Sequence, residues 1–161
     1  MATISILVAV YNAEKYLHKC LESLLSQTLH NIEIICVNDA STDSSLSILN
    51  AYAKKDERIK VVHLSQNVGI AKARNAGLRI STGQYIAFVD SDDWLSKDAC
   101  EKAFDVFTHY PLTDTVLFQV KNVYGDKDVD FIMPSFTTLD GFTAFRESLT
   151  WNIHGVYVVK R

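Results

Sequence analysis

Apolar runs and amphipathic stretches alternate along the first hundred residues of the chain. Short apolar runs bounded by polar residues are typical of strands buried on both faces of a sheet, and four occur, at residues 4–9, 32–37, 59–64 and 85–89. After each run, apolar residues recur every three or four positions, which predicts helices within residues 16–25, 46–53, 70–80 and 99–108. Strands that alternate with helices through short loops predict βαβ units, and therefore a parallel sheet flanked by helices.

The pattern changes after Pro111. Apolar and polar residues alternate over residues 116–124 and again after Gly125-Asp126, which predicts an extended, partly antiparallel region instead of another βαβ unit. Residues 141–149 are predicted to form a short helix and residues 156–159 a strand. Because no helix follows that last strand to cover it, we interpret residues 1–161 as one domain whose carboxyl portion is absent.

Charge and composition exclude several classes of protein. The 161 residues carry a formal net charge of −3, so the chain has no overall basic character for nucleic acid. No apolar run approaches the roughly 20 residues needed to cross a bilayer, and the first run lacks the flanks of a secretory signal. The three cysteines stand far apart in apolar surroundings, which predicts buried, reduced thiols. We therefore expect a cytoplasmic protein, with association at the inner face of a membrane left open.

Polar loops follow three of the predicted strands, at residues 11–14, 38–43 and 90–93. In an open parallel sheet, ligands bind beyond the carboxyl ends of the strands. Those ends meet at one edge of the sheet, so we expect the three loops to lie together there. This edge is the predicted ligand site.

The stretch Asp90-Ser91-Asp92-Asp93 is the most informative of these loops. Three carboxylates in four residues repel one another unless a cation lies among them. Mg²⁺ or Mn²⁺ suits such a place, because it binds one or two carboxylates and fills its other positions with water and phosphate. The alternative is a simple turn in which Asp93 or Ser96 begins the next helix. The two other polar loops at this edge favour the cation site.

Aromatic and cationic side chains add to the predicted site. Tyr11 and Asp39 follow two neighbouring strands, where the ring can stack on a base and the carboxylate can accept its imino N–H; a rim tyrosine and a turn aspartate are the alternative. A cluster of cations begins just after Gly69, at Lys72, Arg74 and Arg79. A helix amino end with cations nearby favours a bound anion, although a solvated helix face explains Arg79 equally well.

Four segments in this order, residues 4–12, 37–43, 67–75 and 88–94, resemble the motifs of the family 2 glycosyltransferases. The resemblance covers roughly residues 2–100. It implies the GT-A fold, a Rossmann-like and mostly parallel sheet flanked by helices, with the mixed region after residue 111. It also implies a nucleotide-diphosphate sugar as donor, with UDP the expected nucleotide.

The resemblance implies a role for individual residues. The nucleotide pocket would be lined by Ala9, Tyr11, Glu14, Asp39, Arg74, Asp90 and Ser91. In that arrangement Tyr11 lies against the base, and Asp39 and Arg74 contact it. Asp90 and Ser91 then serve the ribose and the phosphates.

Asp92 is the last acid of the DxD-type motif, so the resemblance implies that it ligates the Mg²⁺ or Mn²⁺ that bridges the pyrophosphate. The implied reaction is a metal-dependent, inverting transfer of the sugar to the hydroxyl of a saccharide or lipid-linked acceptor, in the synthesis of a cell-surface polysaccharide or glycan. Residues 1–110 would form the nucleotide-binding half, and residues 111–161 the start of the acceptor half.

The sequence departs from the family pattern in two respects. Ala9 stands where the family usually has proline, and we expect a small effect because the contact there is largely through the backbone. The family's general base is an acid further along the chain, and none of the later acids, Asp126, Asp128, Asp130 and Glu147, matches that motif. We interpret those four as surface groups and expect the base to lie beyond Arg161, so that this chain binds the donor but transfers poorly.

The sequence leaves two alternative functions. A non-catalytic nucleotide-sugar-binding module or scaffold is the main alternative, although intact acids at 39, 90 and 92 argue against decay of a catalytic site. A receiver-type signalling domain needs an acidic pair after the first strand, where Tyr11-Asn12 stands. The five histidines lack the spacing of a zinc site.

Overall fold

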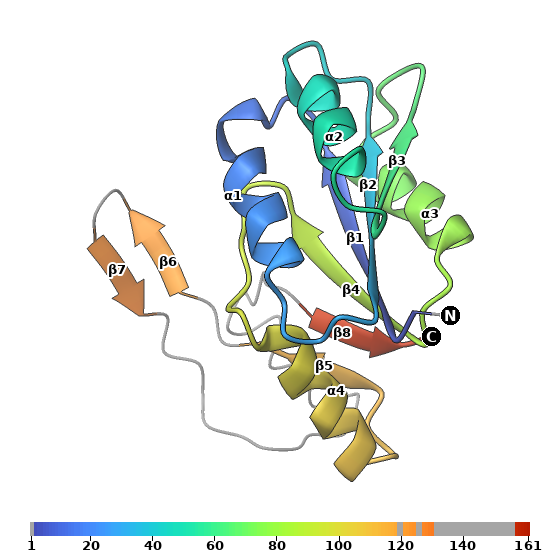
Figure 1. The fold of residues 1–161 in the computed structure, drawn as a ribbon, viewed down its shortest axis with the longest axis vertical. Helices are drawn as coiled ribbons and strands as arrows, with labels where there is room; N and C mark the ends of the chain where they lie inside the picture. Colours follow the sequence, from blue (N-terminus) through green and yellow to red (C-terminus); the bar gives the residue numbers. More distant parts are fainter. Residues whose placement is uncertain (1, 119–120, 125–126, 131–156) are drawn as a thin grey trace. The chain divides into compact units, whose positions relative to one another are not determined.

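Strands and helices alternate through the first 109 residues, as the apolar pattern predicts (Figure 1). The computed structural model describes residues 2–118, 121–124, 127–130 and 157–161. Its elements are β1 (Ile4–Val10), α1 (Glu14–Leu25), β2 (Ile32–Asn38), α2 (Ser45–Ala53), β3 (Ile59–His63), α3 (Ile70–Ile80), β4 (Tyr85–Asp90), α4 (Ala99–His109), β5 (Thr115–Leu117), β6 (Lys121–Tyr124), β7 (Lys127–Asp130) and β8 (Tyr157–Lys160). The predicted helix at 141–149 lies outside the described residues.

The six-stranded sheet has the order β3-β2-β1-β4-β8-β5. β1 lies between β2 and β4 and is parallel to both, and β3 is parallel to β2. β8 pairs with β4 in the antiparallel direction, and β6 pairs with β7 in the same way. The sheet is therefore mostly parallel with an antiparallel region after residue 111, which confirms the predicted fold class.

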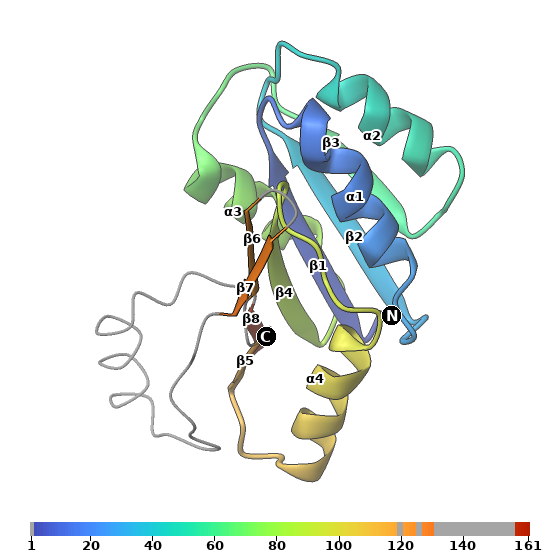
Figure 2. The same cartoon turned by 90° about the vertical axis from the view of Figure 1, so that its left-hand side faces the viewer.

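The chain divides into two units, residues 1–116 with 157–161 and residues 117–156. In the first unit, α1 and α2 cover one face of the sheet and α3 covers the other (Figure 2). Each of these helices buries one side, and α3 buries Ala73 and Gly77. A side chain at Gly77 would place its Cβ 3.2 Å from Val37 Cγ2 and 3.3 Å from Leu7 Cδ2, so glycine allows α3 to approach the sheet closely.

The three cysteines, Cys20, Cys36 and Cys100, are free and buried, which confirms the prediction of buried, reduced thiols. Burial raises the pKa of Cys100 to about 12. Among the described residues, no helix combines the length and the apolar character needed to span a membrane.

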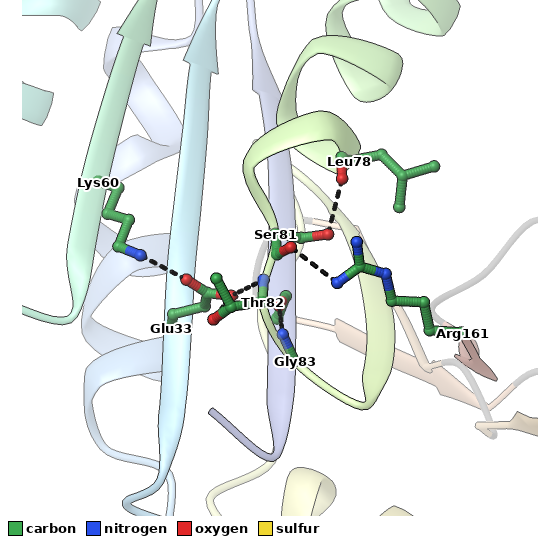
Figure 3. A network of polar contacts seen from close by, with 8 residues as sticks. Glu33, Lys60, Leu78, Ser81, Thr82, Gly83 and Arg161 are labelled. Atoms are coloured by element: carbon green, nitrogen blue, oxygen red, sulfur yellow. Dashed lines mark hydrogen bonds and ion pairs between the residues drawn. The ribbon is translucent and has the colours of Figure 1, made fainter. Parts of the chain in front are cut away.

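A buried polar network holds the amino-terminal edge of the sheet (Figure 3). Glu33 in β2 accepts hydrogen bonds from Lys60 Nζ at 2.7 Å and from the backbone N–H of Thr82 at 2.6 Å. Ser5 Oγ donates to Glu33 Oε1 at 2.5 Å and accepts from the N–H of Gly83 at 2.8 Å. A Cβ at Gly83 would lie 2.6 Å from the backbone nitrogen of Ser5. The network therefore fastens the turn between α3 and β4 to β1 and β2.

Candidate functional site

The three predicted loops do lie at one edge of the sheet. β1, β2 and β4 are adjacent and parallel, and their register places Ala9 opposite both Val37 and Asp90. The residues that follow these strands therefore emerge side by side (Figure 1). We call this edge, formed by residues 11–14, 38–43 and 90–93, the rim.

Hydrogen bonds join the first two loops of the rim. The backbone N–H of Asn12 donates to Ser41 Oγ at 3.1 Å, and Asn12 Oδ1 accepts from the N–H of Thr42 at 2.8 Å. Asn12 has a φ of 50°, a left-handed conformation that asparagine adopts more readily than most residues. Tyr11, just before it, is half-exposed at 50%. The loop is thus fixed by its neighbour while the Tyr11 ring stays open to a ligand.

Glu14 and Asp43 cap each other's helix. The N–H of Glu14, at the start of α1, donates to Asp43 Oδ2 at 3.0 Å, and Glu14 Oε2 accepts from the N–H of Ser44 at 2.9 Å. Asp43 Oδ1 also accepts from the N–H of Ser45, the first residue of α2. The first N–H groups of a helix have no partner inside it, so each loop satisfies the helix start of the other. Asp43 therefore serves both helices, and the place of Glu14 in the nucleotide pocket stays a prediction.

Asp39 connects β2 to the start of α3. Its side chain is only 3% exposed, and its two oxygens accept from the N–H groups of Val68 and Gly69, each at 2.8 Å. A carboxylate has about four acceptor positions, so these two bonds leave capacity for a further donor. Sequence reasoning placed Asp39 at the rim but missed these partners, which lie 29 and 30 residues away along the chain.

Arg74 turns from α3 toward the acidic loop. Its Nη2 lies 2.6 Å from Asp90 Oδ1, and its guanidinium stands 5.6 Å from the ring centroid of Phe88. The other two cations of α3, Lys72 and Arg79, instead line a hollow beside Leu64, Val68, Asn75 and Ala76. The predicted cluster therefore divides, and only Arg74 contacts a predicted site residue in the described part of the chain.

The acidic loop begins as a tight turn in which the N–H of Asp93 donates to the carbonyl of Asp90 at 3.0 Å. Burial, and then the charges of Asp92 and Asp90, raise the pKa of Asp93 above its usual range. Burial and the same three acids raise the pKa of Cys20 to about 12. Burial is the larger cause of both shifts, and the clustered negative charge of the acidic loop adds to it.

The residues at the rim fit a phosphate-bound divalent cation. Among the described residues, no three Asp, Glu, His or Cys side chains converge on one point. Mg²⁺ and Mn²⁺ at phosphate sites need only one or two protein carboxylates, and Asp92 is exposed beside the other two acids. The side chains of the later acids, Asp126, Asp128, Asp130 and Glu147, lie outside the described part of the structure.

The fold is that of a GT-A glycosyltransferase, and known structures agree. The crystal structure of Staphylococcus aureus TarS residues 1–349 matches with a TM-score of 0.71 and 34% sequence identity, over 78% of this chain and 37% of that one. TarS has also been solved in complex with UDP and with UDP-GlcNAc. The sequence model of Glycosyl transferase family 2 matches residues 5–157, and the chain belongs to that family.

Curated relatives include EpsH of Bacillus subtilis, named as a glycosyltransferase, which is 54% identical over 99 residues. The poly(ribitol-phosphate) beta-glucosyltransferase of Bacillus spizizenii is 43% identical over 125 residues. WfaP of Escherichia coli, named as a UDP-Glc:alpha-D-GlcNAc-diphosphoundecaprenol beta-1,3-glucosyltransferase, is 40% identical over 129 residues. The matches cover 62%, 76% and 80% of this chain but only 28%, 20% and 49% of these relatives.

Proposed function

We propose that the rim binds a UDP-linked sugar together with Mg²⁺ or Mn²⁺, and that residues 1–110 form the donor half of an inverting glycosyltransferase. One observation carries the proposal: an acidic loop, with Arg74 paired to its first acid, lies beside the loops of Tyr11 and Asp39. The 34% identity to TarS, which has been solved with UDP and UDP-GlcNAc, supports UDP as the nucleotide.

Each rim residue has a part in this proposal. The exposed Tyr11 ring stacks on the base, and Asp39 uses its remaining acceptor capacity for a base N–H. Ala9 and Glu14 complete the pocket wall, and Arg74 contacts the base while its guanidinium pairs with Asp90. Asp90 and Ser91 lie toward the ribose and phosphates. Asp92 would hold the divalent cation, which when bound neutralises the charge that develops on the leaving diphosphate.

The acceptor hydroxyl must lose a proton as it attacks the anomeric carbon. We assign the rim carboxylates to the donor, so the base comes from a segment outside the rim. A saccharide or lipid-linked acceptor in cell-surface glycan synthesis agrees with the printed names of WfaP and the poly(ribitol-phosphate) enzyme. A lipid-linked acceptor also favours a cytoplasmic protein that works at the inner face of a membrane.

Calorimetric titration of UDP, GDP and dTDP, each with and without Mn²⁺, tests this proposal. We expect UDP to bind best and Mn²⁺ to tighten its binding. Asp92→Ala should abolish the gain from Mn²⁺, whereas Asp105→Ala on the exposed side of α4 should leave it unchanged. Failure of all three nucleotides to bind, or an undiminished gain in Asp92→Ala, would overturn the proposal. UDP binding without transfer by a longer form of the protein would identify a binding module instead.

A further inference from the structure

The acidic loop continues into a segment that runs along α1. Cys20 Sγ lies 3.7 Å from the carbonyl oxygen of Asp90, at the start of this segment. Further on, Ser23 Oγ accepts from the N–H of Leu95 at 3.1 Å. We call the contacts between residues 19–28 and residues 90–101 the α1 seam. The seam joins α1 to the whole stretch between β4 and α4.

The two ends of the seam are held by different contacts, a cation–π contact at one end and hydrogen bonds of Thr28 at the other. Lys19 Nζ lies 3.2 Å from the ring centroid of Trp94, a cation–π contact that places the first residue after the acids over α1. At the other end, the N–H of Thr28 donates to the carbonyl of Lys97 at 2.9 Å, and Thr28 Oγ1 donates to Glu101 Oε2 at 2.7 Å.

Gln27 lies at the centre of the seam and is only 1% exposed. Its Nε2 donates to the carbonyls of Ser23 at 3.0 Å and Ser96 at 2.8 Å, and its Oε1 accepts from the N–H of Cys100 at 3.0 Å. Both amide hydrogens are therefore used. A buried polar group with all its donors satisfied fixes the geometry of its partners, because each alternative leaves a buried group unpaired.

The bond to Cys100 also stabilises the start of α4. Asp98, the residue before this helix, makes no side-chain capping hydrogen bond. Gln27 Oε1 instead satisfies a backbone N–H in the first turn, one of the groups that a helix cannot pair internally. Gln27 thus anchors both the loop at Ser96 and the helix that follows it.

We propose that Gln27 is a positioning residue that holds the acidic segment Asp90–Asp93 in the conformation that binds the cation and diphosphate. β4 fixes one end of the stretch between β4 and α4, and Gln27 fixes the other. The three acids between these anchors repel one another, so the stretch needs both to stay compact. This inference rests on the proposed donor site and names the residue, outside the rim, that shapes it.

Gln27→Met is the direct test, because methionine has a similar volume but none of the three hydrogen bonds. Loss of a partner that orients a metal-binding group commonly costs about tenfold or more in metal affinity, so we expect the Mn²⁺-dependent gain in UDP affinity to fall by about that factor. The affinity for UDP without metal should fall by a smaller factor, since Tyr11 and Asp39 lie in other loops and only Asp90 and Ser91 belong to the acidic segment.

Trp94 provides a second readout that does not depend on transfer. Trp94 and Trp151 are the two tryptophans of the chain, so Trp151→Phe leaves only the one beside the acids. Paramagnetic Mn²⁺ bound at Asp92 with UDP should quench its fluorescence. In the Gln27→Met variant of this background, quenching should require about tenfold more Mn²⁺.

Three further variants separate positioning from general stability. Gln84→Met changes an exposed glutamine at the opposite edge of the sheet and should bind as the unchanged protein does. Leu49→Ala opens a cavity under α2, so it should lower the melting temperature but keep the Mn²⁺-dependent gain. If Gln27→Met does not fold, Gln27→Asn replaces it, since an amide one methylene shorter cannot reach both Ser96 and Cys100.

Retention of the full Mn²⁺ gain and of quenching in the folded Gln27 variant would overturn the inference while leaving the donor site intact. Equal losses of the Mn²⁺-dependent gain in Gln27→Met and Leu49→Ala would also overturn it, because they would show that the gain depends only on the stability of the fold. Absence of Mn²⁺-dependent UDP binding in the unchanged protein would overturn the proposed function, and this inference with it.

Discussion

Asp39 serves the fold and the proposed site with the same carboxylate. Its position after a buried strand could be predicted from the sequence, because the apolar run ends just before it. Its bonds to the N–H groups of Val68 and Gly69 could not, since they depend on how close β2 and the start of α3 come in space. The same holds for Arg74, whose helix could be predicted but whose direction toward Asp90 could not.

Asp39→Asn should weaken both folding and UDP binding. The amide places an N–H group where a carboxylate oxygen accepts from Val68 or Gly69, and an unpaired buried group costs about 1–3 kcal/mol. Urea denaturation and UDP titration check this, with Asp105→Asn as the exposed control. Unchanged stability would show that the loop before α3 does not depend on this carboxylate.

Arg74→Met should separate binding from stability. The Arg74–Asp90 pair is partly exposed, with side chains 29% and 48% accessible, and such pairs contribute less than about 1 kcal/mol. We therefore expect a nearly unchanged melting temperature and a clear loss of UDP affinity. Arg79→Met, on the same helix but turned to the hollow beside Leu64, should bind UDP normally. Equal UDP affinity in the two variants would contradict the role of Arg74.

At the scale of elements, the strands and helices could be predicted from the spacing of apolar residues. The side-chain hydrogen bonds that join one element to another could not. α1 and α2 begin with reciprocal caps between Glu14 and Asp43, residues that the sequence separates by the rest of α1, the strand β2 and two loops. β2 holds α3 at both ends, through Asp39 before the helix and Glu33 after it. Glu33 stands inside an apolar run, where a sequence pattern gives no reason to expect a network.

Asp43→Ala should loosen two helices at once. It removes acceptors from the N–H groups of Glu14 and Ser45, and loss of a helix cap costs about 0.5–2 kcal/mol. The free energy of unfolding in urea measures the loss. Asp105→Ala removes an exposed aspartate from the middle of α4 and serves as the control. A similar loss of unfolding free energy in this variant would show that the caps at the rim do not add to stability.

For the whole molecule, the mostly parallel sheet could be predicted because βαβ units permit few arrangements. The place of β8 between β4 and β5 could not, since it depends on a strand that returns from the far end of the chain. The result is a sheet with two differently built edges. One edge carries the loops of the rim, and the other is closed by the network around Glu33.

This second edge gives the fold a pH dependence. Burial alone would raise the pKa of Glu33, but hydrogen bonds from Lys60, Ser5 and Thr82 lower it to about 2. A carboxyl group whose pKa is lower in the folded state stabilises above its unfolded pKa, and that stabilisation is lost as the pH falls. We therefore expect the free energy of unfolding to decline between about pH 4.5 and pH 2.

Urea denaturation at several pH values measures this decline. Glu33→Gln should lower stability at pH 7 and make the pH dependence shallower, because the charge that Lys60 pairs with is gone. Some slope remains from Asp43, Asp56 and Asp98, whose pKa values are also lowered. An equally steep decline in the variant would show that Glu33 does not supply the acid sensitivity.

The three buried cysteines allow alkylation to report on local opening of the folded chain. Only the thiolate attacks an alkylating reagent, and in the native state Cys20, Cys36 and Cys100 are shielded and hard to ionise. Iodoacetamide should therefore modify each cysteine in proportion to the fraction of molecules in which its surroundings are open, and mass spectrometry of each cysteine peptide would compare the three regions separately. Slower labelling of Cys20 in the presence of UDP and Mn²⁺ would show how much a bound nucleotide reduces local opening around the acidic loop.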